Sequence, residues 1–302
     1  MSKPMADKAS AGAQAWLREK PRVGRRPGPS LSARKRALVA LEIVMLVAAF
    51  FFLFPGLLTL LNSFKPDPEI TSNPISLPTS LSFSNYVEAW KETRFPVVFF
   101  NTFVITVLST AGILLVSSMA AYILVRTKWR ISWALFLLFT FSMVVPFQAI
   151  MVPLFVNAKN LNLLSVLGII PIYIGLGCPL AIFMFHGFIK GVPVEIEEAA
   201  AIDGASMFRR FFQIVLPLLA PITATVAVLD VLWIWNDFLL PLLILPKQST
   251  LQLAQFGFFG MYRQQYSLAM ASLVLSSSPV ILFYLLMQKY IINGISAGAV
   301  KG

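Results

Sequence analysis

Charged side chains are scarce in this 302-residue sequence: they make up 12% of it, whereas hydrophobic residues make up 58%. Soluble domains carry about 25% charged residues, so this composition excludes an ordinary soluble domain and indicates a membrane protein. A membrane-spanning helix needs about 20 apolar residues. Segments of this length, with Glu42 and Asp230 as their only charges, are 37–61, 97–125, 133–155, 163–189, 214–235 and 267–288. The sequence therefore predicts an all-α integral membrane protein with six transmembrane helices.

Cysteine and histidine each occur once, at Cys178 and His186. A single cysteine excludes an intrachain disulfide, and a single histidine without a cysteine partner gives no metal-site pattern. We expect Cys178 to be a packing residue and His186 to be packed or interfacial. The sequence also lacks a G-x-x-x-x-G-K-[ST] loop, so the chain cannot hold ATP phosphates in that way. We find no catalytic triad and no metal cluster in it, and we expect no cofactor on this chain.

Acidic residues are about half as numerous as basic ones, 13 against 24, which gives a net charge of +11. The basic residues are unevenly distributed, and ten of them lie within residues 1–36. With the N-terminus inside, eighteen of the 24 fall on the cytoplasmic side, so the positive-inside rule predicts that both termini are cytoplasmic. This distribution argues against nucleic acid as a partner. The tail 1–36 is too long and basic for a signal peptide, and we expect it to be disordered and to contact anionic membrane lipid.

Internal repeats of 20 to 50 residues are absent, and so is a repeated pair of broken spans of the kind found in many secondary transporters. We expect an external loop at 62–96, in which the stretch NYVEAW forms a short helix on the membrane surface. The longest cytoplasmic connection is predicted at 190–217. The last residues, 293–302, form a cytoplasmic tail whose small residues and glycines argue against a stable helix.

The stretch EEAAAIDG at 197–204 is unusually acidic and alanine-rich for this chain. Pro193 suits the first position of a helix, and the glutamates that follow complement the helix dipole. Gly204 is suited to a left-handed helix end and Ser206 to the cap of a second helix, so we expect two helices that meet at Gly204. Phe208, Phe211, Phe212 and Val215 should share one stripe of the second helix. Alanines permit close approach by another protein, which favours insertion into a partner's groove over the alternative, a solvated connector.

Fixed spacings in this loop resemble a known family. The pattern comprises Glu198, Ala199, Ala200, Gly204, Ile214, Leu216 and Pro217, with Asp203 directly before the glycine. This is similar to the cytoplasmic signature of permease subunits of ATP-binding-cassette importers, and the resemblance covers residues 97–292 as a core permease domain with five spans. It implies the type I importer permease fold. It also implies that the first helix of the loop is a coupling helix, which docks on a separate ATPase subunit.

Other stretches narrow the resemblance. SFKPDPEI, NYVEAW, FNTFVIT, WNDFLLPLLIL and the ending GAVKG are together similar to sugar permeases of the maltose/oligosaccharide type. The resemblance implies a multi-pass protein of the bacterial plasma (inner) membrane. It also implies four partners besides lipid: a second permease, two ATP-binding subunits that hold ATP and Mg, and an extracytoplasmic sugar-binding protein. Cargo of another kind, such as glycerol-phosphate or polyamine, stays open, and an ion-coupled secondary transporter is the alternative class.

Asp230, within the predicted span 214–235, and Asp237, just after it, mark the candidate substrate path. Intramembrane charge costs about 2.5–3.5 kcal/mol on insertion scales, so Asp230 and Asp237 should face protein or water. Trp235, Asn236 and Asp237 combine an aromatic face with polar groups, which suits sugar binding. The alternative is a structural one, in which Asn236 and Asp237 cap a helix break. We also expect Pro217 and Pro221 to kink the start of this span.

Overall fold

The computed structural model describes residues 31–127, 129–245, 249–259 and 265–299, and these contain helices but no β-strand. The chain divides into two compact units, 1–55 and 56–302, with the boundary inside helix α2 (Leu31–Asn62). The helix begins at Leu31, so the prediction of disorder is wrong for residues 31–36, while residues 1–30 lie outside the described part. Extending an existing helix costs far less than starting one, which explains the early start.

Four helices are long and apolar enough to cross a membrane without a break. They are α2, α5 (Phe95–Arg126), α8 (Ile169–Ile189) and α15 (Tyr266–Ala299). Two bent helix pairs raise the total to six if each pair is one span, which is the predicted number. Helix α8 begins six residues later than the predicted span 163–189. The residues before it form a turn, in which the backbone N–H of Leu163 donates to the carbonyl oxygen of Ala158.

Two of the six candidate spans are bent helix pairs, although the sequence shows no obvious repeated pair of broken spans. Helix α6 (Arg130–Ser142) meets α7 (Phe147–Asn160) at 104°. Pro146 lies in this break and disfavours helical geometry in the residue before it. The second pair joins the segment Met207–Leu218 to α12 (Ala220–Asn236) at 76°. Pro217 and Pro221 flank this bend, as predicted.

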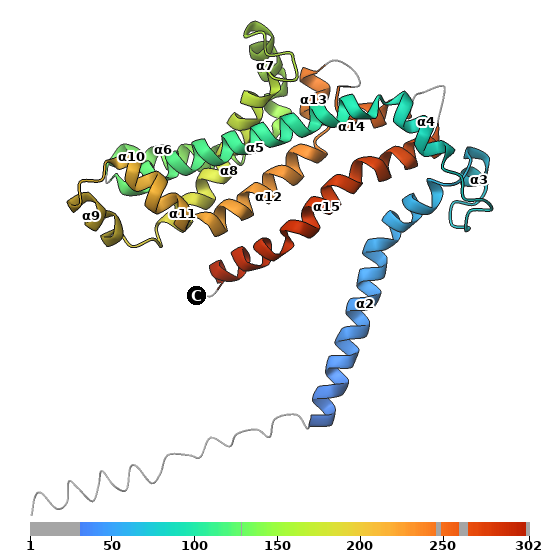
Figure 1. Cartoon of the computed structure of the whole chain (residues 1–302), viewed down its shortest axis with the longest axis horizontal. Helices are drawn as coiled ribbons and strands as arrows, with labels where there is room; N and C mark the ends of the chain where they lie inside the picture. Colours follow the sequence, from blue (N-terminus) through green and yellow to red (C-terminus); the bar gives the residue numbers. More distant parts are fainter. Residues whose placement is uncertain (1–30, 128, 246–248, 260–264, 300–302) are drawn as a thin grey trace, which may run out of the picture. The chain divides into compact units, whose positions relative to one another are not determined.

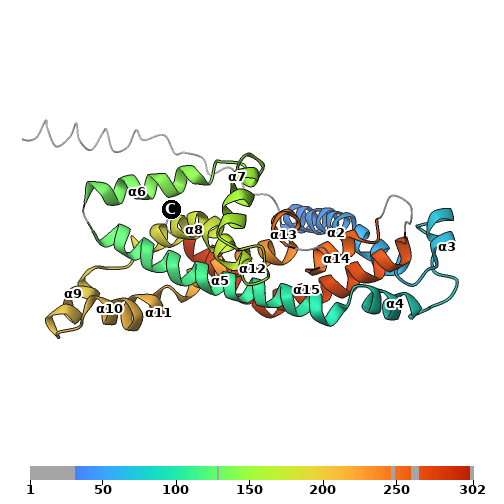
Figure 2. The same cartoon turned by 90° about the horizontal axis from the view of Figure 1, so that it is seen from above.

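Within the unit 56–302, α5 runs along α8, and α12 packs against both α5 and α15 (Figure 1). Both views place α9 (Glu195–Ile202) at one end of this bundle and α4 (Ser84–Glu92) at the other (Figure 2). Helix α3 (Asp67–Ser72) lies at the α4 end. Helices α13 (Leu239–Ile244) and α14 (Leu251–Phe256) follow α12 in the sequence.

The connection 62–96 is an ordered cap on the bundle. Lys65 is fully buried, and its ammonium donates to the carbonyl oxygens of Asn73 and Pro74 at 3.2 and 3.3 Å. The predicted helix at NYVEAW is confirmed as α4. Its Tyr86 hydroxyl lies 2.6 Å from the Ser63 hydroxyl, so this side chain has a partner within the protein.

Two glycines allow α5 and α8 to approach closely. A β-carbon at Gly112 of α5 would lie 2.3 Å from Ile174 Cδ1 of α8. In return, a β-carbon at Gly177 of α8 would lie 2.5 Å from Ile113 Cδ1 of α5 and 3.4 Å from Trp233 Cζ3 of α12. Small residues at helix crossings maximise van der Waals contact where lipid offers no hydrophobic driving force. Gly177 therefore lies where three helices meet.

Both single-copy residues are packed, as predicted. Cys178 is free and buried in α8. His186 is 8% exposed, and its ring stacks on Phe136 of α6 with centroids 3.7 Å apart. The prediction for the tail is wrong in one respect, because α15 continues as a helix to Ala299, through Gly294 and Gly298. Each glycine costs a helix only about 1 kcal/mol, which continuation of a long helix can outweigh.

We expect Gly177→Val to separate α5 from α8 and to lower stability by about 1–3 kcal/mol, because the added carbons overlap a packed interface. Gly187→Val is the matched control, since a β-carbon at Gly187 on the same helix meets nothing within 4 Å. Thermal unfolding of the two purified variants in detergent measures the difference. Equal midpoints for both variants would contradict the close-packing role of Gly177.

Candidate functional site

The loop 190–217 has the predicted two-helix form. Helix α9 ends at Ile202, and Gly204 adopts φ +83°, the left-handed geometry that glycine tolerates. Ser206 caps α10 (Met207–Arg210), because its hydroxyl accepts from Arg209 N at 3.3 Å. One detail is wrong: Pro193 is not the first helical residue, since α9 begins at Glu195. Glycine adopts a positive φ without the steric cost that other residues meet, so Gly204 determines where the chain turns and the loop geometry follows from its local sequence.

The outer face of α9 is available for contact. Glu198 and Ala199 are exposed, Ala200 is half-buried, and Asp203 and Gly204 at the end of the helix are exposed. The Glu198 carboxylate makes no hydrogen bond or ion pair within the part of the chain that the structure describes. Ile202, beside these residues, is 87% exposed. An unpaired carboxylate, small side chains and an exposed isoleucine together form a surface that a partner protein can cover.

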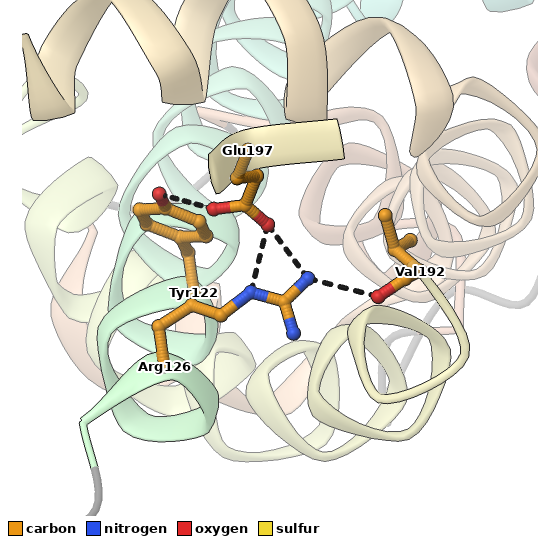
Figure 3. A network of polar contacts seen from close by, with 4 residues as sticks. All are labelled: Tyr122, Arg126, Val192 and Glu197. Atoms are coloured by element: carbon orange, nitrogen blue, oxygen red, sulfur yellow. Dashed lines mark hydrogen bonds and ion pairs between the residues drawn. The ribbon is translucent and has the colours of Figure 1, made fainter. Parts of the chain in front are cut away.

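The inner face of α9 is held by a polar network that sequence reasoning missed (Figure 3). Glu197 is 3% exposed and pairs with Arg126 at the end of α5, at 2.6 Å between Oε1 and Nη2. Arg126 Nε also donates to Oε1 at 2.7 Å, and the Tyr122 hydroxyl donates to Oε2 at 2.7 Å. Arg126 Nη2 further donates to the Val192 carbonyl oxygen at 3.0 Å, before α9 begins. Four polar contacts thus attach α9 and its lead-in to one turn of α5.

The second helix of the loop changes form after four residues. A π-helical segment η1 (Phe211–Val215) follows α10 and leads into α11 (Leu216–Leu218). The predicted single stripe is wrong: Phe211 and Val215 are buried, while Phe208 and Phe212 are 69% and 40% exposed and stack on each other. The wider i→i+5 turn alters the angular spacing on which that stripe was based.

The remaining signature residues lead from η1 into the bend. Ile214 and Leu216 are half-buried beside fully buried Val215, and Pro217 is exposed just before the bend at Leu219. The aromatic ring of Phe211 lies 5.2 Å from that of Tyr122. Tyr122 of α5 therefore contacts both this segment, through Phe211, and α9, through Glu197.

The four candidate residues of the substrate path have different surroundings. Asp230 is 4% exposed in α12, and its Oδ2 has no hydrogen-bond partner among the described residues. Trp235 is 4% exposed, and its indole N–H donates to Ser276 O at 3.1 Å. Asn236 is exposed and donates to Leu232 O of its own helix at 2.8 Å. None of these three side chains lines the large cavity described below.

Asp237 differs from the other three. It follows the end of α12 in extended geometry, and its Oδ1 accepts from Leu239 N at 3.0 Å, at the start of α13. Its Oδ2 accepts from the hydroxyl of fully buried Tyr173 at 2.9 Å. The predicted helix break is confirmed, and Asp237 caps it.

A cavity of about 600 Å³ lies against this break. Its walls come from α6, α7, α8, α12 and α13, and the lining residues are Ser142, Met143, Val145, Phe147, Gln148, Ile150, Gly175, Leu176, Pro179, Leu180, Trp233, Asp237, Leu239 and Leu240. Asp237 is the one member of the predicted set in this lining. Trp233, which the sequence analysis missed, lines it as well. Its position four residues before Asp237, one helical turn away, is the signal that could have revealed it.

A helical bundle with up to six spans, a cavity between its helices and a loop with an exposed face at one end is typical of a membrane transport component. Comparison with known proteins identifies which one. Residues 112–297 match the family of binding-protein-dependent transport system inner membrane components, and the chain belongs to this family. The match includes the loop 190–217 and all residues that line the cavity.

Relatives and a solved structure agree with this assignment. The chain is 42% identical to the probable starch degradation products transport system permease protein AmyC of Thermoanaerobacterium thermosulfurigenes, over 86% of this chain and 96% of the relative. It is 35% identical to the melibiose/raffinose/stachyose import permease protein MelC of Bacillus subtilis, over 90% of this chain and 99% of the relative. The fold matches a chain of a bacterial ABC transporter involved in the import of the acidic polysaccharide alginate, with a TM-score of 0.73 and 24% identity. The match covers 88% of this chain and 99% of that chain.

We expect Glu197→Gln to loosen α9, because the ion pair with Arg126 is lost while the side-chain volume is kept. The amide hydrogens of residues 195–202 should then exchange faster, by about tenfold for each 1.4 kcal/mol of local stability lost. Glu198→Gln is the matched control, since the same change one residue later removes an exposed carboxylate. Hydrogen exchange followed by mass spectrometry measures both, and equal exchange rates would show that the ion pair does not hold α9.

Proposed function

We propose that this chain is the transmembrane permease subunit of an ATP-driven, binding-protein-dependent importer of oligosaccharides. The observation that carries the proposal is its similarity, over 96% and 99% of their lengths, to two permeases named for starch degradation products and for melibiose, raffinose and stachyose. Near-complete coverage means that the similarity extends over most of the chain rather than over one segment. The chain would form half of the translocation path in the bacterial plasma membrane.

The partners follow from what the chain offers and what it lacks. Its sequence has no phosphate-binding loop of the ATPase type, so hydrolysis of ATP with Mg would take place on two separate ATP-binding subunits. The outer face of α9 supplies a docking surface for one of them. A second permease would complete the path, and an extracytoplasmic sugar-binding protein would deliver the cargo. The chain itself would catalyse no reaction.

The proposed coupling rests on the division of α9 into two faces. Glu198 would pair with a basic residue in a cleft of the ATPase subunit, while Ala199 and Ala200 permit close packing. Gly204 would set the angle between α9 and α10. On the opposite face, Arg126 holds Glu197, so a displacement of α9 by the ATPase would pull directly on the end of α5. Mechanical coupling would therefore need no flexible intermediate.

The proposed orientation places the α9 end of the bundle in the cytoplasm, and both termini with it. Among the described residues, Arg126, Arg130, Lys190, Arg209 and Arg210 belong to the helix ends and connections around α9. Three basic residues, Lys65, Lys91 and Arg94, belong to the opposite end, around α4. This asymmetry has the sign of the positive-inside rule.

We expect Glu198→Ala and Gly204→Val to spare membrane insertion but to weaken ATPase association or to separate hydrolysis from transport. Loss of one partner of a desolvated charge pair costs about 2–5 kcal/mol, and a β-branched residue at positive φ costs about 1–3 kcal/mol. Co-purification of the ATPase, binding-protein-stimulated hydrolysis and uptake measure the effect. Gly204→Asn is the matched control, because asparagine tolerates left-handed geometry and should retain activity. Normal assembly, hydrolysis and uptake in both variants would refute the coupling role.

The orientation is tested by cysteine labelling in a Cys178→Ala background. We expect a cysteine at Ser206 to react only with membrane-permeant maleimide in intact cells or spheroplasts. A cysteine at Ser80, in the exposed connection before α4, should react with the impermeant reagent. Labelling of residue 206 from outside would overturn the topology.

A further inference from the structure

Both helix breaks around the cavity leave polar groups directed at one space. The break between α6 and α7 contributes Ser142 and Gln148, and the break after α12 contributes Asp237. Transporters use interrupted helices at their binding sites because the interruption places polar groups at membrane depth. The cavity volume of about 600 Å³ lies within the roughly 300–1,000 Å³ typical of small-molecule sites. Two independent breaks that meet at one cavity indicate a ligand site.

Tyr173 of α8 holds two of the lining residues in place. Its ring is fully buried and packs edge-on against Trp233, with centroids 5.5 Å apart at 85°. Its hydroxyl donates to Asp237 at 2.9 Å. Trp233 is nevertheless 40% exposed, and Asp237 is half-buried, so each retains surface for a ligand. An aromatic face and a carboxylate, one helical turn apart, are thus fixed by one buried side chain.

We propose that Trp233, Asp237 and Gln148 contact the sugar during its passage, an inference that rests on the proposed function. Sugar rings present apolar C–H faces that pack on an indole, and hydroxyl groups that donate to a carboxylate and exchange hydrogen bonds with an amide. Gln148 is exposed and makes no hydrogen bond within the described part of the chain, so both ends of its amide are free. Tyr173 acts as a positioning residue.

The charge of the cavity selects against one class of cargo. Asp237 is the one ionisable side chain in the described lining. A phosphorylated or otherwise anionic solute would meet this carboxylate without a compensating cation, which favours a neutral sugar over glycerol-phosphate. A polyamine would instead be attracted, and competition by spermidine distinguishes the two remaining cargo classes.

The test uses the assembled transporter with its ATPase and binding-protein partners in proteoliposomes, with uptake of radiolabelled maltotriose and of raffinose as readout. Trp233→Ala should lower uptake at least tenfold, and Gln148→Ala at least threefold. In both variants, binding-protein-stimulated hydrolysis should stay within twofold of wild type. Trp233→Phe should recover most of the uptake. Trp133→Ala, which removes an exposed tryptophan of α6 outside the cavity lining, should transport as wild type does.

Each outcome separates the inference from the proposed function. A wild-type complex that imports neither sugar overturns the proposed cargo and this site together. Normal sugar uptake by wild type and equal uptake by Trp233→Ala, Gln148→Ala and Trp133→Ala overturns the site alone. Competition of excess spermidine with the sugar would mark a cation site instead and also overturns it. Gln148 keeps the test decisive if Trp233→Ala fails to fold, because its side chain supports no described contact.

Discussion

The ion pair between Arg126 and Glu197 is the contact on which the position of α9 depends. A helix of eight residues is marginal in water, because the cost of starting it is spread over too few hydrogen bonds. Helix α9 therefore needs a tertiary contact to hold its shape and direction. Arg126 supplies one from a residue 71 positions away, and the Tyr122 hydroxyl occupies the second carboxylate oxygen. With both oxygens paired, the burial of a charged side chain is compensated.

This attachment determines what each acid of the loop can do. Glu197 is committed to the bundle, whereas Glu198, one residue later, is exposed. Adjacent residues on a helix are about 100° apart, so they cannot share a partner on one side. One short helix therefore has a face bound to its own chain and a face left for another protein. In the proposed coupling, a displacement of the outer face by a partner would reach α5 through this attachment.

Local features of the site were predictable from the sequence, and features set by distant contacts were not. Gly204 and Ser206 act on their own backbone, through positive φ and a side-chain cap, so their residue types suffice to predict the turn. The choice between Glu197 and Glu198 depends on Arg126, which no local pattern connects to them. Which of Trp233 and Trp235 lines the cavity likewise depends on contacts with other helices. Two residues rotate a helix by about 200°, and only the packing of α12 decides which indole faces Ser276 and which faces the cavity.

Gly177 lies at the crossing of α8 with α5 and α12. On one side it meets Ile113, which lies on α5 between the close approach at Gly112 and the Tyr122–Arg126 turn. On the other side it meets Trp233 of α12, beside the cavity. Packed interiors are not continuously deformable, so a shift of α5 at this crossing cannot be absorbed by empty space and must move its neighbours. The contact at Gly177 therefore packs α5, α8 and α12 together at one crossing, beside the wall of the cavity.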